Sequence, residues 1–260
     1  MKLSVIIPSY NFSNYIESAM LSVFFQVTNF DFEVIIIDDC STDSSYEKIK
    51  NLFWLKKTGD CYGCNVRIFR NEKNIGGFEN YKQLHKLCNG EYISMLDGDD
   101  VWVDNYKLQR HVDFLDSNKN YIMCFDGYIR DEGNGVYTPN QVCSWLSNIN
   151  PDVSEITTND LLITNPICSS TKTYRNNKEF ILNLFSKYSD EVKFFDWIIN
   201  YNLSKFGPIK YMDTVSAIYR FHGNGLASSM TEEEKLIEIN KIKLILLEDF
   251  NNFQNENNFN

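Results

Sequence analysis

The sequence predicts an α/β fold in which a mostly parallel central sheet is flanked by helices and followed by a C-terminal helical extension. In the first hundred residues, short β-rich runs alternate with segments whose apolar residues recur at helical spacing, which is typical of βαβ units. Each of these β-rich runs ends at a cluster of polar residues. The chain has 260 residues, 43% of them hydrophobic, which is enough to bury a substantial core.

The first half of the chain predicts four strands and three helices. The strands are expected at Leu3–Pro8, Phe32–Ile37, Val66–Phe69 and Tyr92–Leu96. The helices are indicated by Ile16, Met20, Val23 and Phe24, by a start near Ser44, and by Tyr81, Leu84 and Leu87. Because ligands of open α/β sheets bind outside the carboxyl ends of the strands, the four polar clusters describe one cleft.

The second half is patterned more loosely, and we expect it to extend the sheet and to build the other wall of the cleft. Strands are predicted at Tyr121–Phe125, Cys168–Tyr174 and Ile209–Tyr219, and helices at Phe180–Phe185, Phe195–Leu203 and Thr231–Asp249. The stretch Asp131–Pro151 is rich in Gly, Asn and Ser and is predicted to be a loop.

The composition argues against several classes of protein. Lys and Arg number 25 against 35 Asp and Glu, so the net charge is −10 and the chain offers no basic surface to a nucleic acid. The apolar runs are far shorter than the ~20 residues of a membrane span, and the start of the chain lacks a signal-peptide pattern. We therefore expect a cytoplasmic protein, with association with the inner face of the membrane as the alternative. Seven scattered cysteines do not indicate a disulfide framework.

The most informative motif is Asp97-Gly98-Asp99-Asp100, which places three carboxylates within four residues. Such carboxylates repel one another unless a hard divalent cation takes oxygen ligands from them, and Mg²⁺ or Mn²⁺ bound together with substrate phosphates suits this pattern. The alternative is an acidic turn whose last Asp caps a helix near Trp102. Because the cluster directly follows an apolar strand, we favour the metal site.

A second acidic cluster, Asp38-Asp39-Cys40-Ser41-Thr42-Asp43, follows the second predicted strand. A carboxylate in this position can accept hydrogen bonds from a ribose hydroxyl or a base N–H. Ser41 or Asp43 can also cap the next helix, and the two interpretations are compatible. The Gly pair in Asn74-Ile75-Gly76-Gly77 lacks the spacing of a dinucleotide-binding motif and is weak evidence alone.

Four motifs, taken in this order, resemble glycosyltransferase family 2: Ser4-Val5-Ile6-Ile7-Pro8-Ser9-Tyr10-Asn11, Asp38–Asp43, Asn74–Gly77 and Leu96–Trp102. Two looser matches, Phe195–Trp197 and Tyr219–Gly225, extend the resemblance. It implies the A-type glycosyltransferase fold. We expect one domain over residues 1–225, with a nucleotide-sugar-binding half (1–110) and an acceptor-binding half (111–225), followed by a C-terminal helix and tail (226–260).

The resemblance implies an enzyme that transfers a sugar from a nucleotide diphosphate donor, expected to be a UDP-sugar, to an acceptor hydroxyl with inversion. It assigns the nucleotide to Pro8, Tyr10, Asn11, Asp39, Asn74, Gly76 and Asp97. It assigns a divalent metal, Mn²⁺ or Mg²⁺, to Asp99 with His222, and the role of catalytic base to Asp196.

The sequence departs from the family pattern beside the expected base. Phe195 precedes Asp196 where a second acidic residue is more usual, so Asp190 or Glu191 stays an alternative for the base. For His222 the alternative is a histidine in a surface turn. The sequence has no Gln-x-x-Arg-Trp motif of processive synthases, which favours the addition of one sugar at a time.

The expected acceptor is a glycan or a lipid-linked glycan, because aromatic residues are interspersed with polar residues in the second half. These aromatic residues are Tyr128, Tyr137, Trp145 and Tyr174. The terminal helix places Lys235, Lys241 and Lys243 beside apolar residues. Core or dimer packing is its expected use, and contact with a membrane surface is the alternative.

Other interpretations remain open at this stage. A nucleotidyltransferase would need a Gly-rich basic loop after the first strand, where this chain has Pro8-Ser9-Tyr10-Asn11. A non-catalytic nucleotide-sugar-binding module would bind the donor without turning it over. Cys61 and Cys64 with His85 and Cys88 have the spacing of a zinc site, but we favour free thiols on a loop and core residues on a helix.

Overall fold

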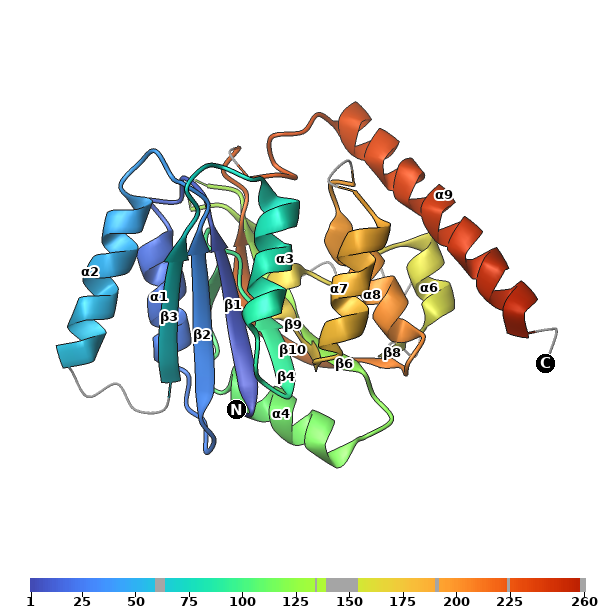
Figure 1. Cartoon of the computed structure of the whole chain (residues 1–260), viewed down its shortest axis with the longest axis horizontal. Coiled ribbons are helices and arrows are strands. Elements are labelled where there is room, and N and C mark those ends of the chain that lie inside the picture. Colours follow the sequence, from blue (N-terminus) through green and yellow to red (C-terminus); the bar gives the residue numbers. More distant parts are fainter. Residues whose placement is uncertain (59–63, 134, 139–153, 190–191, 224, 258–260) are drawn as a thin grey trace.

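The computed structural model describes residues 1–58, 64–133, 135–138, 154–189, 192–223 and 225–257. A twisted central sheet has helices against both of its faces, and the long helix α9 (Glu232–Asn257) lies along one end of the molecule (Figure 1). The predicted fold class, an α/β chain with a mostly parallel sheet, is therefore confirmed.

The strands of the described residues form a single sheet. They are β1 (Leu3–Ser9), β2 (Phe32–Asp38), β3 (Cys64–Arg70), β4 (Tyr92–Met95), β5 (Val101–Trp102), β6 (Met123–Asp131), β7 (Tyr137–Thr138), β8 (Glu155–Ile156), β9 (Lys172–Arg175) and β10 (Ile209–Arg220). The remaining helices are α1 (Ile16–Phe24), α2 (Ser45–Thr58), α3 (Gly77–Leu87), α4 (Lys107–Ser117), α6 (Thr158–Ile163), α7 (Lys178–Lys187) and α8 (Phe195–Ser204).

The main path of the sheet runs in the order β3-β2-β1-β4-β9-β6-β10-β5. Strand β1 is parallel to β2 and β4, β2 is parallel to β3, and β10 is parallel to β6. Strand β9 lies between β4 and β6 and is antiparallel to both. The carboxyl ends of six strands therefore meet, together with the amino end of β9, at one edge of the sheet.

The strand register places the polar clusters of the sequence next to one another at the same edge of the sheet. Ser9 is paired with Asp38, and Asp38 is paired with Arg70, at the carboxyl ends of β1, β2 and β3. Leu96, just beyond β4, donates its backbone N–H to the carbonyl oxygen of Ile6 in β1 (3.1 Å). The turns that follow these strands are consequently neighbours in space, although they are far apart in the sequence.

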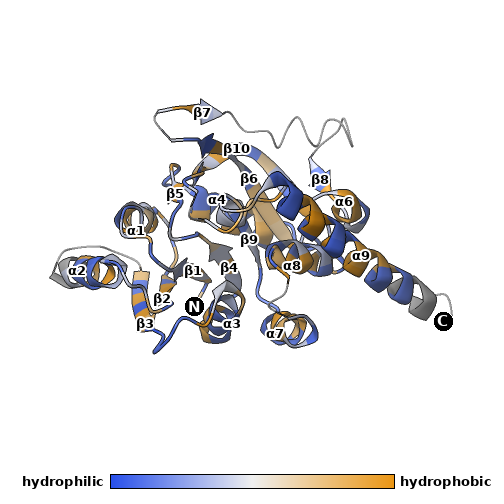
Figure 2. Cartoon of the chain, turned by 90° about the horizontal axis from the view of Figure 1, so that it is seen from above, coloured by the Kyte–Doolittle hydropathy of each residue, from blue (hydrophilic) through white to orange (hydrophobic). Residues whose placement is uncertain are grey.

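Both faces of the sheet are apolar and covered. Alternate residues such as Ile6, Ile35 and Ile37 contribute to the core shared with α3, α7, α8 and α9. Their neighbours, such as Val5 and Ile36, contribute to the core shared with α1, α2 and α4. Figure 2 shows this arrangement as orange segments on the strands and on the helix sides that face them. Because the central strands are buried on both faces, their sequences are almost continuously hydrophobic.

The structure departs from two predicted elements, and it also contains β5, α4, β8 and α6, for which no element was predicted. The expected strand Cys168–Tyr174 is a 3₁₀ turn at Ser169–Thr171 followed by the short strand β9. Its early part turns because Ser170 is used to bind the acidic loop after β4. The expected loop Asp131–Pro151 contains β7, which pairs with the end of β6, and its residues 134 and 139–151 lie outside the described residues.

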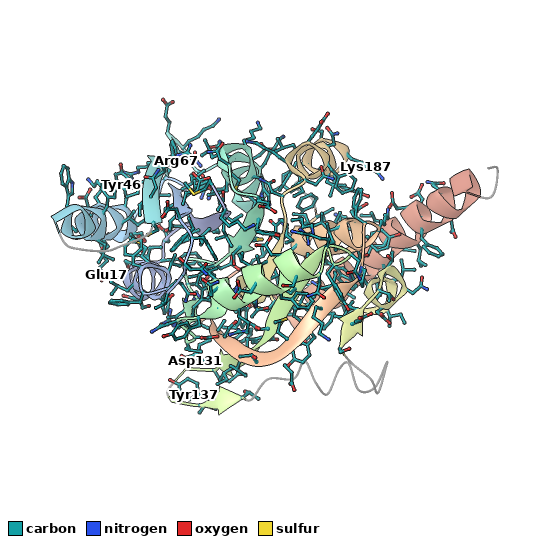
Figure 3. All side chains as sticks on the ribbon, turned by 90° about the horizontal axis from the view of Figure 1, so that it is seen from below. Glu17, Tyr46, Arg67, Asp131, Tyr137 and Lys187 are labelled. Atoms are coloured by element: carbon teal, nitrogen blue, oxygen red, sulfur yellow. The ribbon has the colours of Figure 1, made fainter. Side chains whose placement is uncertain are left out.

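Helix α9 is anchored to the body of the molecule. Ile242 and Leu246 are fully buried in the core, and the carboxylate of Asp249 forms ion pairs with Lys187 of α7 (2.5 Å) and Lys205 after α8. Lys187 is labelled in Figure 3. The predicted packing of this helix against the core is therefore observed. Among the described residues, no helix has the length and apolar character needed to cross a membrane.

Candidate functional site

The shared sheet edge opens onto a cavity of about 460 Å³. Its lining residues are Tyr10, Asn11, Gly223 and Ser229. The first two belong to the turn after β1, and the other two belong to the segment after β10. Tyr10 keeps 39% of its surface exposed. The structure therefore brings residues of the first and the last motif of the sequence into the lining of one cavity.

Asn11 joins the turns that follow β1 and β2. Its φ angle of 58° lies in the left-handed region, which Asn tolerates better than most residues. Its backbone N–H donates to Ser41 Oγ (2.9 Å), and its Oδ1 accepts from the backbone N–H of Thr42 (2.9 Å). Ser41 is thus engaged by Asn11, whereas Asp43 accepts from the backbone N–H of Ser45 at the start of α2 (2.9 Å). Of the two helix caps considered, the structure uses Asp43.

Asp39 shapes the loop that leads into α3. It is 2% exposed, and its Oδ1 accepts from Asn71 Nδ2 (2.7 Å) and from the backbone N–H of Ile75 (3.0 Å). Its Oδ2 accepts from the backbone N–H of Gly76 (2.9 Å), which also donates to Asn74 Oδ1 (2.9 Å). Both oxygens of this expected ribose-binding carboxylate therefore hold the 74–76 loop beside the cleft.

The acidic loop after β4 passes close beneath the turn after β1. Gly98 donates its backbone N–H to the carbonyl oxygen of Pro8 (3.2 Å), and a Cβ at this position would lie 2.7 Å from that oxygen. Only glycine allows this approach without a shift of the backbone. Pro8 therefore contributes its carbonyl group to the site by fixing the acidic loop.

Asp100 is the structural member of the acidic cluster. It is 1% exposed, accepts from Ser170 Oγ (2.5 Å) and accepts from the backbone N–H of Arg220 (3.0 Å). The alternative in which it caps a helix near Trp102 is wrong. Val101 and Trp102 pair with β10 as strand β5, and the next helix begins at Lys107.

Asp99 and His222 form the pair of side chains best suited to a metal. Asp99 Oδ2 lies 3.0 Å from His222 Nε2, and both side chains are largely but not completely buried. The imidazole stacks on Tyr15 with ring centroids 4.5 Å apart. Arg220 Nη1 donates to the backbone carbonyl of Asp99 (3.0 Å), which fixes this part of the loop. His222 is thus a partner of the acidic loop and is not a histidine of an isolated surface turn.

The donor atoms of this pair fit Mn²⁺ or Mg²⁺. A carboxylate oxygen and an imidazole nitrogen are both metal ligands, and Mg²⁺ in particular is commonly held by few protein groups together with phosphates and water. Within the described ranges, no group of three or more His, Cys, Asp or Glu side chains is placed to hold a metal by itself. A metal at this pair would therefore need the substrate diphosphate to complete its coordination.

The charge balance of the acidic loop also favours a cation. Burial raises the pKa of Asp97 to about 7, and the neighbouring charge of Asp99 adds to this rise. Burial raises the pKa of Asp100 well above its usual range. The hydroxyl group of Tyr81 donates to Asp97 Oδ1 and partly opposes the effect. A bound cation would relieve this repulsion because positive charge favours ionised carboxylates.

Asp196 lies in the first turn of α8, close enough to Asp97 and Tyr81 for its charge to help raise the pKa of both groups. Its Oδ2 accepts a hydrogen bond from Asn165 Nδ2 (3.0 Å). The alternative bases Asp190 and Glu191 lie outside the described residues.

Several side chains of this site were not identified from the sequence. They are Tyr81, Asn165, Ser170, Lys172 and Arg220. Tyr81 was used only as an apolar position of a helix, and Arg220 stands beside a motif residue without a role of its own. Ser170 and Lys172 reach the site because β9 is inserted between β4 and β6, and Arg220 reaches it through β10, and local sequence patterns do not reveal such long-range pairings.

The predicted acceptor aromatics separate into different environments. Tyr174 is fully buried and donates its hydroxyl to Met95 Sδ (3.5 Å), so its assignment to the acceptor wall is wrong. Tyr137 is 57% exposed and is paired with Asp131 across β7 and β6 (Figure 3). Tyr128 is partly buried beside Tyr219. Trp145 lies outside the described residues.

His85 and Cys88 are core residues of the α3 region. His85 is buried, with Nδ1 2.7 Å from the carbonyl oxygen of Tyr81 and Nε2 2.8 Å from the hydroxyl of Tyr174. Burial raises the pKa of the Cys88 thiol to about 12, so the thiolate needed for zinc is disfavoured. Cys61 lies outside the described residues. The favoured alternative, in which His85 and Cys88 belong to the core, agrees with these contacts.

The chain matches the family model of glycosyl transferase family 2 over residues 4–184. A relative named an uncharacterised glycosyltransferase of Nostoc is 33% identical over 247 residues, which make up 90% of this chain and 70% of that protein. The chain spans 64 to 70% of the length of the curated relatives that align with most of it. The chain therefore belongs to glycosyl transferase family 2, as the four motifs predicted.

Two solved structures share the fold. TarS of Staphylococcus aureus (residues 1–349) in complex with UDP-GlcNAc superposes with a TM-score of 0.66 at 21% identity, covering 95% of this chain and 66% of that one. The mannosyltransferase PcManGT of Pyrobaculum calidifontis in complex with GDP-Man and Mn²⁺ superposes with a TM-score of 0.58 at 14% identity, covering 88% of this chain and 59% of that one. The expected A-type fold is thus confirmed.

Proposed function

We propose that this chain is a metal-dependent, inverting glycosyltransferase that moves one sugar from a UDP-sugar to a hydroxyl of a glycan or a lipid-linked glycan. One observation carries the proposal. The charge of Asp196 acts on Asp97, which lies two residues from Asp99 of the Asp99–His222 pair, and Gly223 beside His222 lines the cavity next to Tyr10.

The donor is proposed to bind with its nucleotide in the cavity beside Tyr10. The exposed ring of Tyr10 is suited to contact a base, and the 74–76 loop held by Asp39 lies next to the same turn. Asp97, which lies deeper in the cleft, is proposed to be on the ribose side. The UDP-GlcNAc complex of TarS supports a uridine donor for a chain with this fold.

Asp99 and His222 are proposed to hold Mn²⁺ or Mg²⁺ against the diphosphate of the donor. When bound, such a cation would neutralise the negative charge that develops on the leaving diphosphate. Asp99 and His222 hold this position because Arg220 fixes the backbone of the acidic loop and Tyr15 supports the imidazole ring. The Mn²⁺ in the PcManGT complex supports this metal for a chain of the same fold.

Asp196 is proposed to be the base. Inversion by one displacement requires a carboxylate that accepts the proton of the acceptor hydroxyl while its oxygen attacks the anomeric carbon opposite the diphosphate. Asp196 comes from α8, whereas the metal pair comes from the segments after β4 and β10, so the two groups approach the cleft from different elements. TarS is named a poly(ribitol-phosphate) beta-N-acetylglucosaminyltransferase, which supports a hydroxyl-rich acceptor for this chain also.

A thermal-shift panel tests the proposal directly. UDP, GDP, CDP and dTDP are each added with and without Mn²⁺, because a ligand that binds the native state raises its apparent stability by mass action. We expect the largest shift with UDP together with Mn²⁺. Equal shifts with and without Mn²⁺ would contradict the metal site, and a preference for another nucleotide would contradict the donor.

Turnover separates this function from the two alternatives. Release of UDP from UDP-GlcNAc, UDP-glucose or UDP-galactose, with water or a glycan as acceptor, is expected for a glycosyltransferase. Binding of these donors without any release would favour a non-catalytic nucleotide-sugar-binding module. Release of pyrophosphate from UTP and a sugar phosphate would instead identify a nucleotidyltransferase.

A further inference from the structure

A lysine is buried directly beneath the cleft. Lys172 of β9 has no exposed surface, and its Nζ donates a hydrogen bond of 2.8 Å to Oδ1 of Asn200. A buried ammonium group with a neutral amide as its hydrogen-bond partner is costly unless negative charge lies nearby. The carboxylates that act on Lys172 are those of Asp196 and Asp97, the two acidic groups at the floor of the proposed site.

Two asparagines connect this ammonium group to Asp196. Asn200 Nδ2 donates to Asn165 Oδ1 (3.1 Å), and Asn165 Nδ2 donates to Asp196 Oδ2 (3.0 Å). An ammonium group has three donors and no acceptor, so Asn200 must turn its oxygen toward Lys172. The NH₂ group of Asn200 then faces Asn165, and the NH₂ group of Asn165 faces Asp196. The charge of Lys172 therefore sets the orientation of both amides.

We propose that Lys172, Asn200 and Asn165 form a directed hydrogen-bond chain that positions Asp196 to act as the base. The inference rests on the function proposed above. The three residues are positioning residues because they act through Asp196. Oδ2 of Asp196 is held by Asn165, whereas Oδ1 has no hydrogen-bond donor among the described residues and is the oxygen left for the acceptor hydroxyl.

The surrounding elements keep the chain rigid. Asp196 and Asn200 are separated by four residues on α8, so they lie on the same side of that helix. Asn165 also accepts from the backbone N–H of Ile167 (3.3 Å), and Trp197 Nε1 donates to the carbonyl oxygen of Leu161 (2.7 Å), which joins α8 to the end of α6. The titratable groups that face Asp196 from the other elements are Tyr81, Asp97, Cys168 and Lys172.

Asn200→Asp tests the direction of the chain. The new carboxylate is close in size to the amide and can pair with Lys172, so a merely structural role for Asn200 predicts nearly normal activity. In a directed chain, however, the carboxylate cannot donate to Asn165, which must then turn its NH₂ group toward position 200 and its oxygen toward Asp196. We expect kcat for UDP release from UDP-GlcNAc to fall about tenfold or more, with KM for the donor little changed, and the acidic limb of the pH–rate profile to move to higher pH.

Asn202→Asp is the matched control. Asn202 is also buried on α8, accepts from a lysine, Lys205 (3.1 Å), and donates to a carbonyl oxygen, that of Ile198 (2.9 Å), but it has no contact with Asp196. This variant should leave the position of the acidic limb unchanged. An equal displacement of the limb in both variants, or no displacement in Asn200→Asp, would overturn the proposal.

A substrate-free measurement completes the test. In ¹⁵N spectra of the whole chain, the side-chain NH₂ signal of Asn165, assigned by its loss in Asn165→Ala, should shift strongly in Asp196→Asn and in Lys172→Met, and little in Asn202→Asp. An Asn165 signal that ignores Asp196 and Lys172 would refute the chain of contacts. If Asp196→Asn instead turns over the donor normally while the NH₂ signal shifts as expected, the assignment of the base fails and the hydrogen-bond chain stands.

Discussion

At the scale of single residues, the proposed metal depends on Asp99 and its contact with His222. Asp99→Asn keeps the size of the side chain but removes the charge that would bind a cation. The fold should persist, because the variant also relieves repulsion from Asp97 and Asp100. At a hundredfold excess of UDP over its Kd, the wild-type stabilisation is about 2.7 kcal/mol, and we expect Asp99→Asn to lose its Mn²⁺-dependent part and to abolish turnover.

Thermal shifts with UDP, with and without Mn²⁺, measure this effect, and EDTA should reproduce it in the wild type. Asp113→Asn serves as the control, since Asp113 is an exposed carboxylate on α4 whose partner is Gln109. A variant at Asp99 that responds to UDP and Mn²⁺ as the wild type does would remove this carboxylate from the proposed metal site.

The base is the second prediction at this scale. Loss of a general base commonly costs ~10² to 10⁴ in rate, so Asp196→Asn should lower kcat by about that factor while donor affinity changes little. Initial rates of UDP release and the UDP-induced thermal shift measure the two quantities separately. Asp190→Asn and Glu191→Gln should lose much less. If one of these is inactive while Asp196→Asn is active, the role of base belongs to that residue.

Asp97 and Asp99 were identified from a local signal, whereas His222 and Asp196 were identified only through the family resemblance. Asp97 and Asp99 directly follow a strand, so their position at the sheet edge follows from the topology of parallel strands. Arg220 and Ser170 are different, because each meets the acidic loop only after β9 and β10 have joined the sheet. Contacts of this kind depend on long-range strand order, which a single sequence does not encode in any local pattern.

At the scale of elements, the turn after β1 and the acidic loop after β4 pack against each other at Gly98. In Gly98→Ala the new Cβ would lie 2.7 Å from the carbonyl oxygen of Pro8 and 3.1 Å from side-chain atoms of Phe12 and Ile16. Since a backbone atom cannot move as freely as a side chain, we expect a loss of about 1 to 3 kcal/mol in the free energy of unfolding. Urea denaturation measures it.

Gly77→Ala is the matched control for this prediction. Gly77 begins α3, and a Cβ there would have no atom within 4 Å. Alanine favours a helix by up to about 1 kcal/mol over glycine, so this variant should be as stable as the wild type or more stable. Equal losses in both variants would show that the close approach at Gly98 does not limit stability.

The packing of α3 against β9 predicts a pH dependence. Burial lowers the pKa of His85 from 6.5 to about 4, so between these pH values the unfolded chain binds a proton that the folded chain does not. The stability contributed by neutral His85 is therefore complete above about pH 6.5 and is lost as the pH falls toward 4. A difference of this size corresponds to roughly 3 kcal/mol.

Urea denaturation at pH 7.5 and pH 4.5 measures this effect in the wild type and in His85→Gln. The variant should lose less stability on acidification, because glutamine keeps the polar contacts to Tyr81 and Tyr174 without titrating. His111 is also buried with a lowered pKa and should give both proteins a shared residual dependence. An identical pH response in the two proteins would contradict the environment assigned to His85.

The elements also show where sequence patterns are reliable. The parallel strands β1 to β4 were found within a few residues, because β-rich runs with polar ends are local signals, and this includes the edge strand β3, which has no buried residue. The 3₁₀ turn at Ser169–Thr171 was assigned to a strand, because its residues suit either state and the bond from Ser170 to Asp100 decides between them. The local preference was overridden by a tertiary contact.

At the scale of the whole molecule, one sheet connects the two halves inferred from the sequence. Strands β4 and β6 belong to different sides of residue 110, yet both pair with β9. The proposed donor and acceptor halves therefore share a single framework, and the division at residue 110 stays an interpretation of function. The net charge of −10 opposes the approach of a diphosphate, which is why the proposed site needs a local cation.

The last prediction concerns the packing of helix α9 against the core of the molecule. Leu246 is fully buried against the core, whereas Leu244, two residues earlier on the same helix, is 69% exposed. Leu246→Ala should cost about 2 to 4 kcal/mol in the free energy of unfolding because it leaves a cavity, and Leu244→Ala should change it by less than about 0.5 kcal/mol. Urea denaturation of the two variants compares equal chemical changes on opposite sides of the helix. If Leu246→Ala is as stable as Leu244→Ala, α9 does not pack on the core in solution, and its apolar residues must serve another surface.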